Sequence, residues 1–193
     1  MGFILVAYYT YGSIYENSAM LLQSAATALG VSCHVKGIRD LGGWCKNTSY
    51  KPKFIRDCMF EFAGYDIAYT DADSMIHAYP SLFDETTADV VIRKQDFPWR
   101  QNEYMSGTFF LRNSEKCAAM VSSWIDKTNS CETMRRKPET WDQALLGRAI
   151  VESGIQCEQL PHSYIYYDHI EQIEGKVENP VFTHMQYSRK TCC

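Results

Sequence analysis

The hydrophobic and polar positions along the chain alternate between the period of a strand and that of a helix. Residues 3–9 form a nearly continuous apolar run, FILVAYY, which is typical of a strand buried on both faces of a mainly parallel sheet. Apolar positions then recur at helical spacing up to Gly30, and Ser13 and Glu16 in front of them have the spacing of a capping box. The chain is therefore predicted to begin with a strand and a helix.

Strands and helices continue to alternate downstream. Residues 94–107, which include Pro98 and Trp99, show no clean period, and we interpret them as a long functional loop. Predicted helices begin at Pro52, at Ser114 and with the capping-box sequence of residues 140–143. Predicted strands occupy residues 33–38, 66–70, 89–93, 108–112, 155–160, 164–167 and 180–184.

This order predicts the α/β class, with a mostly parallel central sheet and helices on both faces. The length of 193 residues indicates one domain that spans residues 1–193. No apolar stretch is long enough for a membrane span, and residues 1–6 lack the features of a signal peptide, so we expect a cytoplasmic protein. A net charge of −4 argues against nucleic acid as a partner.

Two carboxylates, Asp71 and Asp73, follow the predicted strand of residues 66–70 directly. Ligands of α/β sheets bind outside the carboxyl ends of the strands, which places this pair at the expected site. Carboxylate oxygens suit a hard divalent cation, Mg²⁺ or Mn²⁺, and such a cation bridges the oxygens of a diphosphate. The alternative is structural, because Asp73 could cap the next turn while Asp71 is solvated.

Several segments beyond this pair carry a family resemblance. They are KPKFI at 51–55, DIAYTDAD at 66–73, YPSLF at 79–83, MSGTFFL at 105–111, WDQ at 141–143, and PVFTH at 180–184 followed by Ser188 and Arg189. In this order they resemble the nucleotide-diphospho-sugar transferases of the GT-A fold. The resemblance covers about residues 3–190 and is greatest to the small single-domain glycosyltransferases of bacteria and large viruses.

The resemblance implies a metal-dependent transfer of a sugar from a nucleoside-diphosphate sugar to a saccharide, glycan or protein acceptor. Asp71, Asp73 and His184 would be the metal ligands, and the imidazole favours Mn²⁺ over Mg²⁺. The family also favours UDP as the nucleotide and retention of the anomeric configuration. The alternatives for His184 are a structural histidine satisfied in the core and a histidine at the surface.

The same resemblance assigns residues to the donor. The nucleotide would lie against Tyr8, Tyr9, Thr10 and Tyr15, its diphosphate against Lys51, Arg189 and Lys190, and its sugar against Ser106 and Gly107. Asp142 and Gln143 are the candidates for catalysis, and the sequence leaves open whether Asp142 acts as a base, a nucleophile or an anchor for the sugar. The alternatives are core tyrosines, an exposed Lys51, a solvated basic tail and a carboxylate that only complements the helix dipole at Asp142.

One position departs from the family pattern. Many relatives carry glycine where this chain has Tyr187, so a side chain could crowd the diphosphate there and the role of Lys190 is in doubt. Two other functions also fit an Asp-x-Asp sequence: a phosphatase or nucleotidyltransferase, and a nucleotide-sugar binding module without catalysis. The first fits poorly, because a phosphatase nucleophile of this kind normally follows the first strand.

Overall fold

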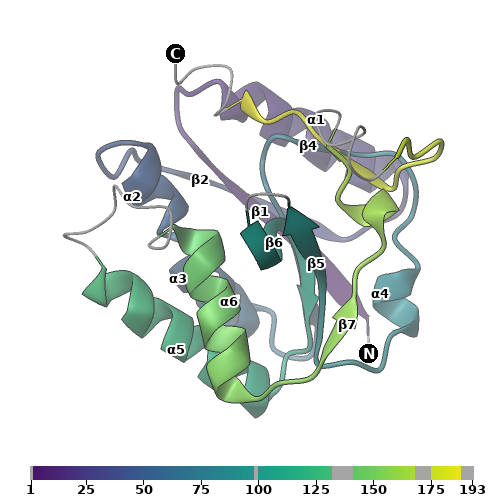
Figure 1. Cartoon of the computed structure of the whole chain (residues 1–193). Helices are drawn as coiled ribbons and strands as arrows, with labels where there is room; N and C mark the ends of the chain where they lie inside the picture. The colour runs from purple at the N-terminus through teal and green to yellow at the C-terminus, as the bar shows by residue number, and fades with distance from the viewer. Residues whose placement is uncertain (1, 98–99, 132–140, 168–174, 188–193) are drawn as a thin grey trace.

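A mixed central sheet organises the molecule (Figure 1). The computed structural model describes residues 2–97, 100–131, 141–167 and 175–187. Within these ranges the sheet has six strands in the order β2-β1-β3-β6-β5-β7. They are β1 (Phe3–Thr10), β2 (Cys33–Ile38), β3 (Asp66–Thr70), β5 (Val90–Phe97), β6 (Arg100–Leu111) and β7 (Cys157–Gln159). The pairs β1–β2, β1–β3 and β5–β7 are parallel, whereas β6 runs antiparallel to β3 and β5, so parallel pairing predominates as expected.

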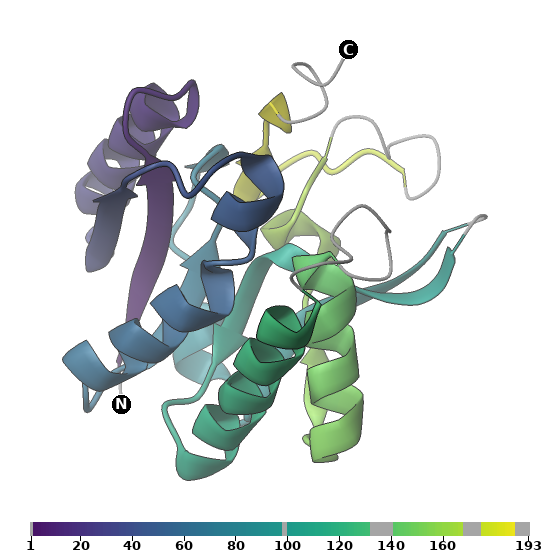
Figure 2. The same cartoon turned by 90° about the vertical axis from the view of Figure 1, so that its left-hand side faces the viewer.

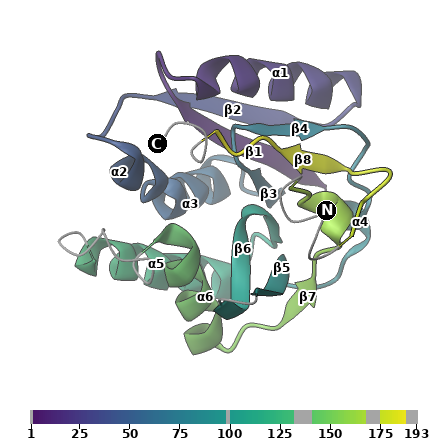
Figure 3. The ribbon, with the colours of Figure 1, turned by 45° about the horizontal axis from the view of Figure 1, so that its top comes forward.

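Helices cover both faces of this sheet, which confirms the predicted architecture (Figures 2 and 3). On one face lies α1 (Tyr15–Ala28), and on the other lie α3 (Lys51–Glu61), α5 (Glu115–Ser130) and α6 (Asp142–Ser153). The position of strand β1 between two cores explains why residues 3–9 are apolar. Leu5 and Ala7 pack on the α1 side while Val6 packs on the α3 side, so successive residues enter opposite cores.

A short antiparallel ribbon lies beside α1 and brings the end of the chain back to the middle of the sheet. It consists of β4 (Ser74–Ile76) and β8 (Phe182–His184), and Ser74 pairs with His184. Figure 3 shows the ribbon next to β1 and α1. The short helices α2 (Trp44–Thr48) and α4 (Leu82–Glu85) lie in connections that the sequence pattern did not assign.

The prediction of a loop at residues 94–107 is wrong. Strands β5 and β6 form an antiparallel hairpin whose arms project from the body of the protein (Figure 2). The register shifts between Ile92 and Lys94 and again between Gln95 and Phe97. Each irregularity reverses the face on which the next side chain lies, and this removes the alternation that a strand would otherwise show.

The strand predicted at residues 164–167 is also wrong. A 3₁₀ helix, His162–Tyr164, occupies its beginning, and an isolated bridge joins Tyr166 to Thr183. Tyrosine and isoleucine favour strands, but Pro161 starts a turn here. The Tyr164 hydroxyl accepts a hydrogen bond from the Leu82 N–H (3.1 Å), which fixes this turn against α4.

The helix caps agree with the sequence in part. Ser114 caps α5, because its side chain accepts a hydrogen bond from the Cys117 N–H. Ser13 does not form the expected box with Glu16. Its hydroxyl accepts from the Tyr15 N–H, and the Glu16 carboxylate accepts from the Gly12 N–H, because α1 begins one residue later than the box requires.

The box predicted at residues 140–143 has no counterpart in the described part of α6. Thr140 lies outside the described residues, and Trp141 is at the N-cap without a side-chain hydrogen bond. The Gln143 side chain accepts a hydrogen bond from the Ser106 N–H (3.2 Å), so it faces β6 instead of the helix end.

Within residues 2–97, 100–131, 141–167 and 175–187, every helix is too short or too polar to cross a bilayer.

Candidate active site

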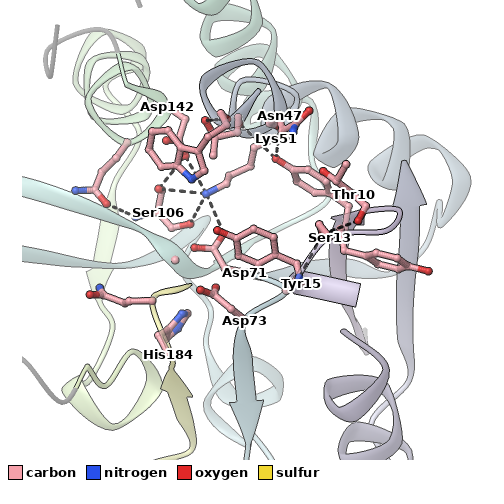
Figure 4. A pocket seen from close by; sticks show the side chains of 18 of the residues that line it. Thr10, Ser13, Tyr15, Asn47, Lys51, Asp71, Asp73, Ser106, Asp142 and His184 are labelled. Atoms are coloured by element: carbon pink, nitrogen blue, oxygen red, sulfur yellow. Dashed lines mark hydrogen bonds and ion pairs between the residues drawn. The ribbon is translucent and has the colours of Figure 1, made fainter. Parts of the chain in front are cut away.

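A cavity of about 1350 Å³ opens at the carboxyl ends of β1 and β3 (Figure 4). The N-termini of α3 and α6, the loop before α2, strand β6 and the end of β8 complete its walls. All twelve of the described residues that the sequence assigned to the site line this cavity. Arg189 and Lys190 lie outside the described residues, and their contact with a diphosphate stays a prediction.

The three predicted metal ligands come together in this cavity. Asp71 and Asp73 follow β3, and the pairing of β4 with β8 places His184 opposite Ser74. One ligand atom from each of the three side chains lies within 4.8 Å of the others. Asp73 and His184 are buried, and Asp71 is half-buried beside the cavity. Two carboxylates and an imidazole at this spacing are a suitable ligand set for Mn²⁺ or Mg²⁺.

A chain of hydroxyl groups determines which ring nitrogen of His184 carries a proton. The Ser74 hydroxyl donates to the carbonyl of Asp71 (2.7 Å), which can only accept. Each hydroxyl has a single proton to donate. Because the Ser74 proton is already used, Thr70 must donate to Ser74 (2.8 Å). Thr108 must in turn donate to Thr70 (2.9 Å). The remaining contact, Thr108 to His184 Nε2 (2.9 Å), then needs the imidazole as donor.

His184 therefore has its proton on Nε2 and a lone pair on Nδ1. Burial, and secondarily the charge of Lys51, lower the pKa of His184 to about 3, so the ring is neutral at physiological pH. A neutral imidazole whose other nitrogen donates to a fixed acceptor is the form that binds metals. The hydroxyl chain thus supports the fit of this site to a divalent cation.

Replacing Thr108 tests the hydroxyl chain. Thr108→Val keeps the shape of the side chain but removes the acceptor for the His184 Nε2–H, and we expect Mn²⁺ affinity to fall about 10–100-fold. Thr108→Ser keeps the hydroxyl and is the matched control. Isothermal titration with Mn²⁺ measures the affinity, and ¹⁵N shifts of the metal-free His184 ring report its tautomer. Unchanged Mn²⁺ affinity in Thr108→Val would contradict the assignment.

Lys51 is buried among acidic groups at the first turn of α3, with 3% of its surface exposed. Its Nζ lies 2.8 Å from Asp142 Oδ2 and 3.1 Å from Asp71 Oδ1, and it donates to the carbonyl of Ser106 (3.1 Å). Burial alone would lower the pKa of Lys51, but the carboxylates of Asp142 and Asp71 outweigh it and raise the pKa above its ordinary value. The sequence placed Lys51 at the donor phosphates; in the structure its ammonium joins the candidate metal ligand Asp71 to the catalytic candidate Asp142.

Asp142 and Gln143 reach the cavity from the N-terminus of α6. The Asp142 carboxylate accepts hydrogen bonds from Lys51 and from the Ser106 hydroxyl (3.1 Å). The Trp124 indole donates to the carbonyl of Asp142 (3.1 Å) and fixes the start of the helix against the core. Asp142, Gln143 and Ser106 thus form one connected wall, opposite the metal-ligand candidates across Lys51 (Figure 4).

Gly107 is needed for a reason that the sequence did not indicate. The sequence suggested close approach of the backbone to a sugar. In the structure, a Cβ at this position would collide with the Tyr167 hydroxyl and lie 3.1 Å from His184 Cε1. The Gly107 carbonyl also accepts a hydrogen bond from the Asp71 N–H (2.8 Å). Glycine therefore lets β6 lie close to the candidate metal ligand His184.

Comparison with known proteins identifies the family. A family profile described as nucleotide-diphospho-sugar transferase matches residues 46–191, which is most of the chain. The chain belongs to the nucleotide-diphospho-sugar transferase family. This confirms the resemblance inferred from the sequence and implies a nucleotide-sugar donor. No curated protein sequence matches.

The fold of this transferase also occurs in a solved structure of another protein. The chain is similar to the crystal structure of a glycosyltransferase involved in the glycosylation of the major capsid of PBCV-1, with a TM-score of 0.73. The match covers 98% of this chain and 96% of the other at 12% sequence identity. At that identity the similarity concerns the fold, and it confirms the glycosyltransferase fold expected from the sequence.

The tyrosines assigned to the nucleotide of the transferase pack against other side chains and helices of the protein. Tyr8 is buried, packs edge-on against Tyr50 (5.6 Å between centroids) and donates its hydroxyl hydrogen bond to the Asn47 carbonyl (2.8 Å). Tyr9 is buried beside α1, and Tyr15 is half-buried at the helix start. All three line the cavity, as does Thr10, so contact with a nucleotide stays a prediction for each of them.

Tyr187, where many relatives carry glycine, is not one of the described residues that line the cavity of the transferase. Its ring lies against Tyr15 (6.2 Å between centroids), and its hydroxyl accepts a hydrogen bond from Ser18 on α1 (3.3 Å). The preceding Gln186 has a φ of 48°, which turns the backbone so that the Tyr187 N–H donates to Asp73 Oδ2 (3.0 Å). This backbone bond orients the carboxylate of a candidate metal ligand.

Sequence reasoning missed the neutral side chains that support the site. Thr70, Ser74 and Thr108 form the hydroxyl chain, and Tyr69 donates to Asp71 Oδ1 (2.8 Å). Tyr69, Thr70 and Thr108 lie inside the family blocks and Ser74 directly follows one. Hydroxyl side chains are common in strands, however, and only strand pairing brings these together into a chain. Trp44 and Trp141 also line the cavity and were not assigned to it.

Proposed function

We propose that this family member is a metal-dependent glycosyltransferase of the hexosyl- or pentosyl-transferring class. Its donor would be a nucleoside-diphosphate sugar, with UDP favoured as the nucleotide, and its acceptor a saccharide, glycan or protein. The observation that carries the proposal is the convergence of Asp71, Asp73 and His184 at the end of β3. This is where the family places donor and metal, and three ligands of two types that suit Mn²⁺, carboxylate and imidazole, meet there.

The chain's own groups have distinct tasks in this proposal. Asp71, Asp73 and the Nδ1 of His184 would hold the cation, which when bound neutralises charge on the leaving diphosphate. Asp142 and Gln143 would contact the transferred sugar. Lys51 holds Asp71 and Asp142 at a fixed separation, so the metal end and the sugar end of the site are positioned together.

A ligand screen by thermal shift tests the proposal. We expect UDP with Mn²⁺ to raise the melting temperature more than either alone, because a ligand that binds only the native state stabilises it by mass action, by about 2.7 kcal/mol at one hundred times its Kd. GDP, CDP and ADP serve as comparison nucleotides. Failure of all four to stabilise the protein in the presence of Mn²⁺ or Mg²⁺ would contradict a nucleotide-sugar donor.

Assays of turnover separate the remaining alternatives. Transfer or hydrolysis of a UDP-sugar that requires Mn²⁺ supports the transferase. Release of inorganic phosphate from a simple phosphomonoester without a sugar donor would indicate a phosphatase, and tight donor binding with neither reaction would indicate a binding module. We further propose retention of configuration, which NMR of the product anomer measures directly.

A further inference from the structure

We propose that the indole rings of Trp44 and Trp141 form the acceptor subsite of the cavity and that they take a pyranose sugar. The inference rests on the proposed transferase function and names the substrate class of its second partner. It begins from two large aromatic side chains that line the cavity and remain partly exposed to solvent.

The two indoles meet from separate parts of the chain. Trp44 is the first residue of α2, and Trp141 directly precedes α6. Their ring centroids lie 6.1 Å apart in an edge-to-face arrangement. Both line the cavity, although 39% of Trp44 and 42% of Trp141 is exposed. Together they place two partly exposed aromatic rings in contact within the lining of the cavity.

The exposure of these rings contrasts with the tryptophan that supports the fold. Trp124 is fully buried and donates its indole hydrogen bond to the Asp142 carbonyl. Trp141 occupies a helix N-cap, where serine, threonine, asparagine or aspartate would stabilise the helix by roughly 1 kcal/mol. A large exposed aromatic surface beside a cavity, at a position that local stability disfavours, is typical of a binding surface.

The support of Trp44 is rigid. The Asp40 carboxylate accepts hydrogen bonds from the N–H groups of Gly42 and Gly43 (both 3.0 Å) and from the Asn47 side chain (2.9 Å). The Asn47 carbonyl in turn accepts from Tyr8 on β1. The turn that carries Trp44 is thus tied to the sheet before any ligand arrives, which lowers the entropic cost of binding.

The position of Trp141 favours the acceptor over the donor. Trp141 adjoins Asp142, the candidate for contact with the transferred sugar, whereas the metal-ligand cluster lies beyond Lys51. The cavity of about 1350 Å³ exceeds the roughly 300–1,000 Å³ of common small-molecule sites, so it has room for a second molecule beside the donor.

A pyranose matches the chemistry of this surface. One face of such a sugar carries C–H groups that pack against an aromatic ring, and its edge carries hydroxyl groups. Aromatic side chains bind ligands that are apolar on one side and polar on the other. Polar side chains also line this cavity, among them Asn47, Thr48, Glu103 and Gln143.

NMR of the indole N–H groups tests the proposal in the full chain. The protein is saturated with UDP and Mg²⁺, and methyl glycosides of glucose, galactose, mannose and xylose are added at millimolar concentrations. We expect saturable shifts of the Trp44 and Trp141 signals, which Trp→Phe variants assign. Trp44→Ala combined with Trp141→Ala should abolish glycoside binding and leave UDP affinity within about twofold, roughly 0.4 kcal/mol. The control is Phe60→Ala, because Phe60 is an 89% exposed aromatic on α3 that does not line the cavity.

Three outcomes would overturn the inference. The first is the lack of any indole shift with the whole glycoside panel. The second is a loss of UDP affinity of about tenfold or more, 1.4 kcal/mol, in the double variant, which would assign the indoles to the donor. The third is indole shifts with phosphatidylcholine–phosphatidylglycerol vesicles and none with glycosides, which would indicate a membrane surface. Failure of UDP to bind at all contradicts the proposed function instead, and glycosides added without UDP then still test the aromatic pair.

Discussion

Asp73→Asn is expected to reduce metal-dependent turnover of a UDP-sugar at least about 100-fold, equivalent to about 2.7 kcal/mol of transition-state stabilisation. The carboxylate of Asp73 is buried, and one of its oxygens accepts a hydrogen bond from the Tyr187 N–H. Asparagine has the same size and can keep that bond, but it lacks the charge that attracts a cation. The loss should therefore appear as weaker Mn²⁺ binding with an intact fold.

The same variant has an opposite expected effect on the stability of the metal-free protein. Burial, and then the charge of Asp71, raise the pKa of Asp73 from 3.8 to about 6. Because the folded pKa is above the unfolded one, the native state binds more protons between these values, and ionising Asp73 costs stability as the pH rises through this window. The difference corresponds to roughly 3 kcal/mol at neutral pH. Asp73→Asn removes that cost, so it should melt above the wild type at pH 7 and match it near pH 4.

Calorimetry across this pH range, with and without Mn²⁺, measures both effects. The matched control is Asp57→Asn, because Asp57 has a half-exposed carboxylate on α3 outside the cavity and should change neither quantity. Full Mn²⁺-dependent activity in Asp73→Asn would contradict the assignment of Asp73 as a metal ligand. A gain in metal-free stability together with a loss of activity would indicate that the Asp73 carboxylate serves function at a cost in stability.

The fold could be predicted from the sequence wherever an element is buried on both sides. Strands β1 and β3 pack against both cores and were located within a residue or two, because their central residues are apolar on both faces. The inner parts of β5 and β6 were predicted, but the outer part of their hairpin was assigned to a loop because two register shifts interrupt the alternation there. The short ribbon β4–β8 depends on pairing between distant segments, which no local pattern carries.

The residues of the site could be predicted better than their contacts. The family blocks located Asp71, Asp73 and His184, and the structure brings their ligand atoms together. The partners of these groups depend on which strands are neighbours. Thr108 reaches His184 only because β6 pairs with β3, and no spacing in the sequence expresses that pairing. For the same reason, the burial of Lys51 between two carboxylates was not visible in the segment KPKFI.

Lys51→Met is expected to destabilise the protein by about 3–5 kcal/mol at neutral pH, because it leaves two carboxylates in the site without their shared cation. For a chain of 193 residues this corresponds to a fall in melting temperature of about 6–20 °C. The raised pKa of Lys51 means that its contribution is fully present below the ordinary lysine pKa of 10.5 and is lost as the pH rises through the folded value. At acidic pH the stability difference between the variant and the wild type should shrink, because protonation of Asp71 removes one of the two unpaired negative charges.

This outcome distinguishes two roles for Lys51. If it only contacted the donor phosphates, its loss would weaken donor binding and leave the melting temperature of the ligand-free protein unchanged. If it joins Asp71 to Asp142, the ligand-free protein is destabilised, and adding Asp142→Asn should restore part of the loss because one unpaired charge disappears. Lys53→Met is the matched control, since Lys53 is exposed on the same helix. A cation at Asp71 and Asp73 would replace part of the missing positive charge, so Mn²⁺ should stabilise Lys51→Met by more than it stabilises the wild type.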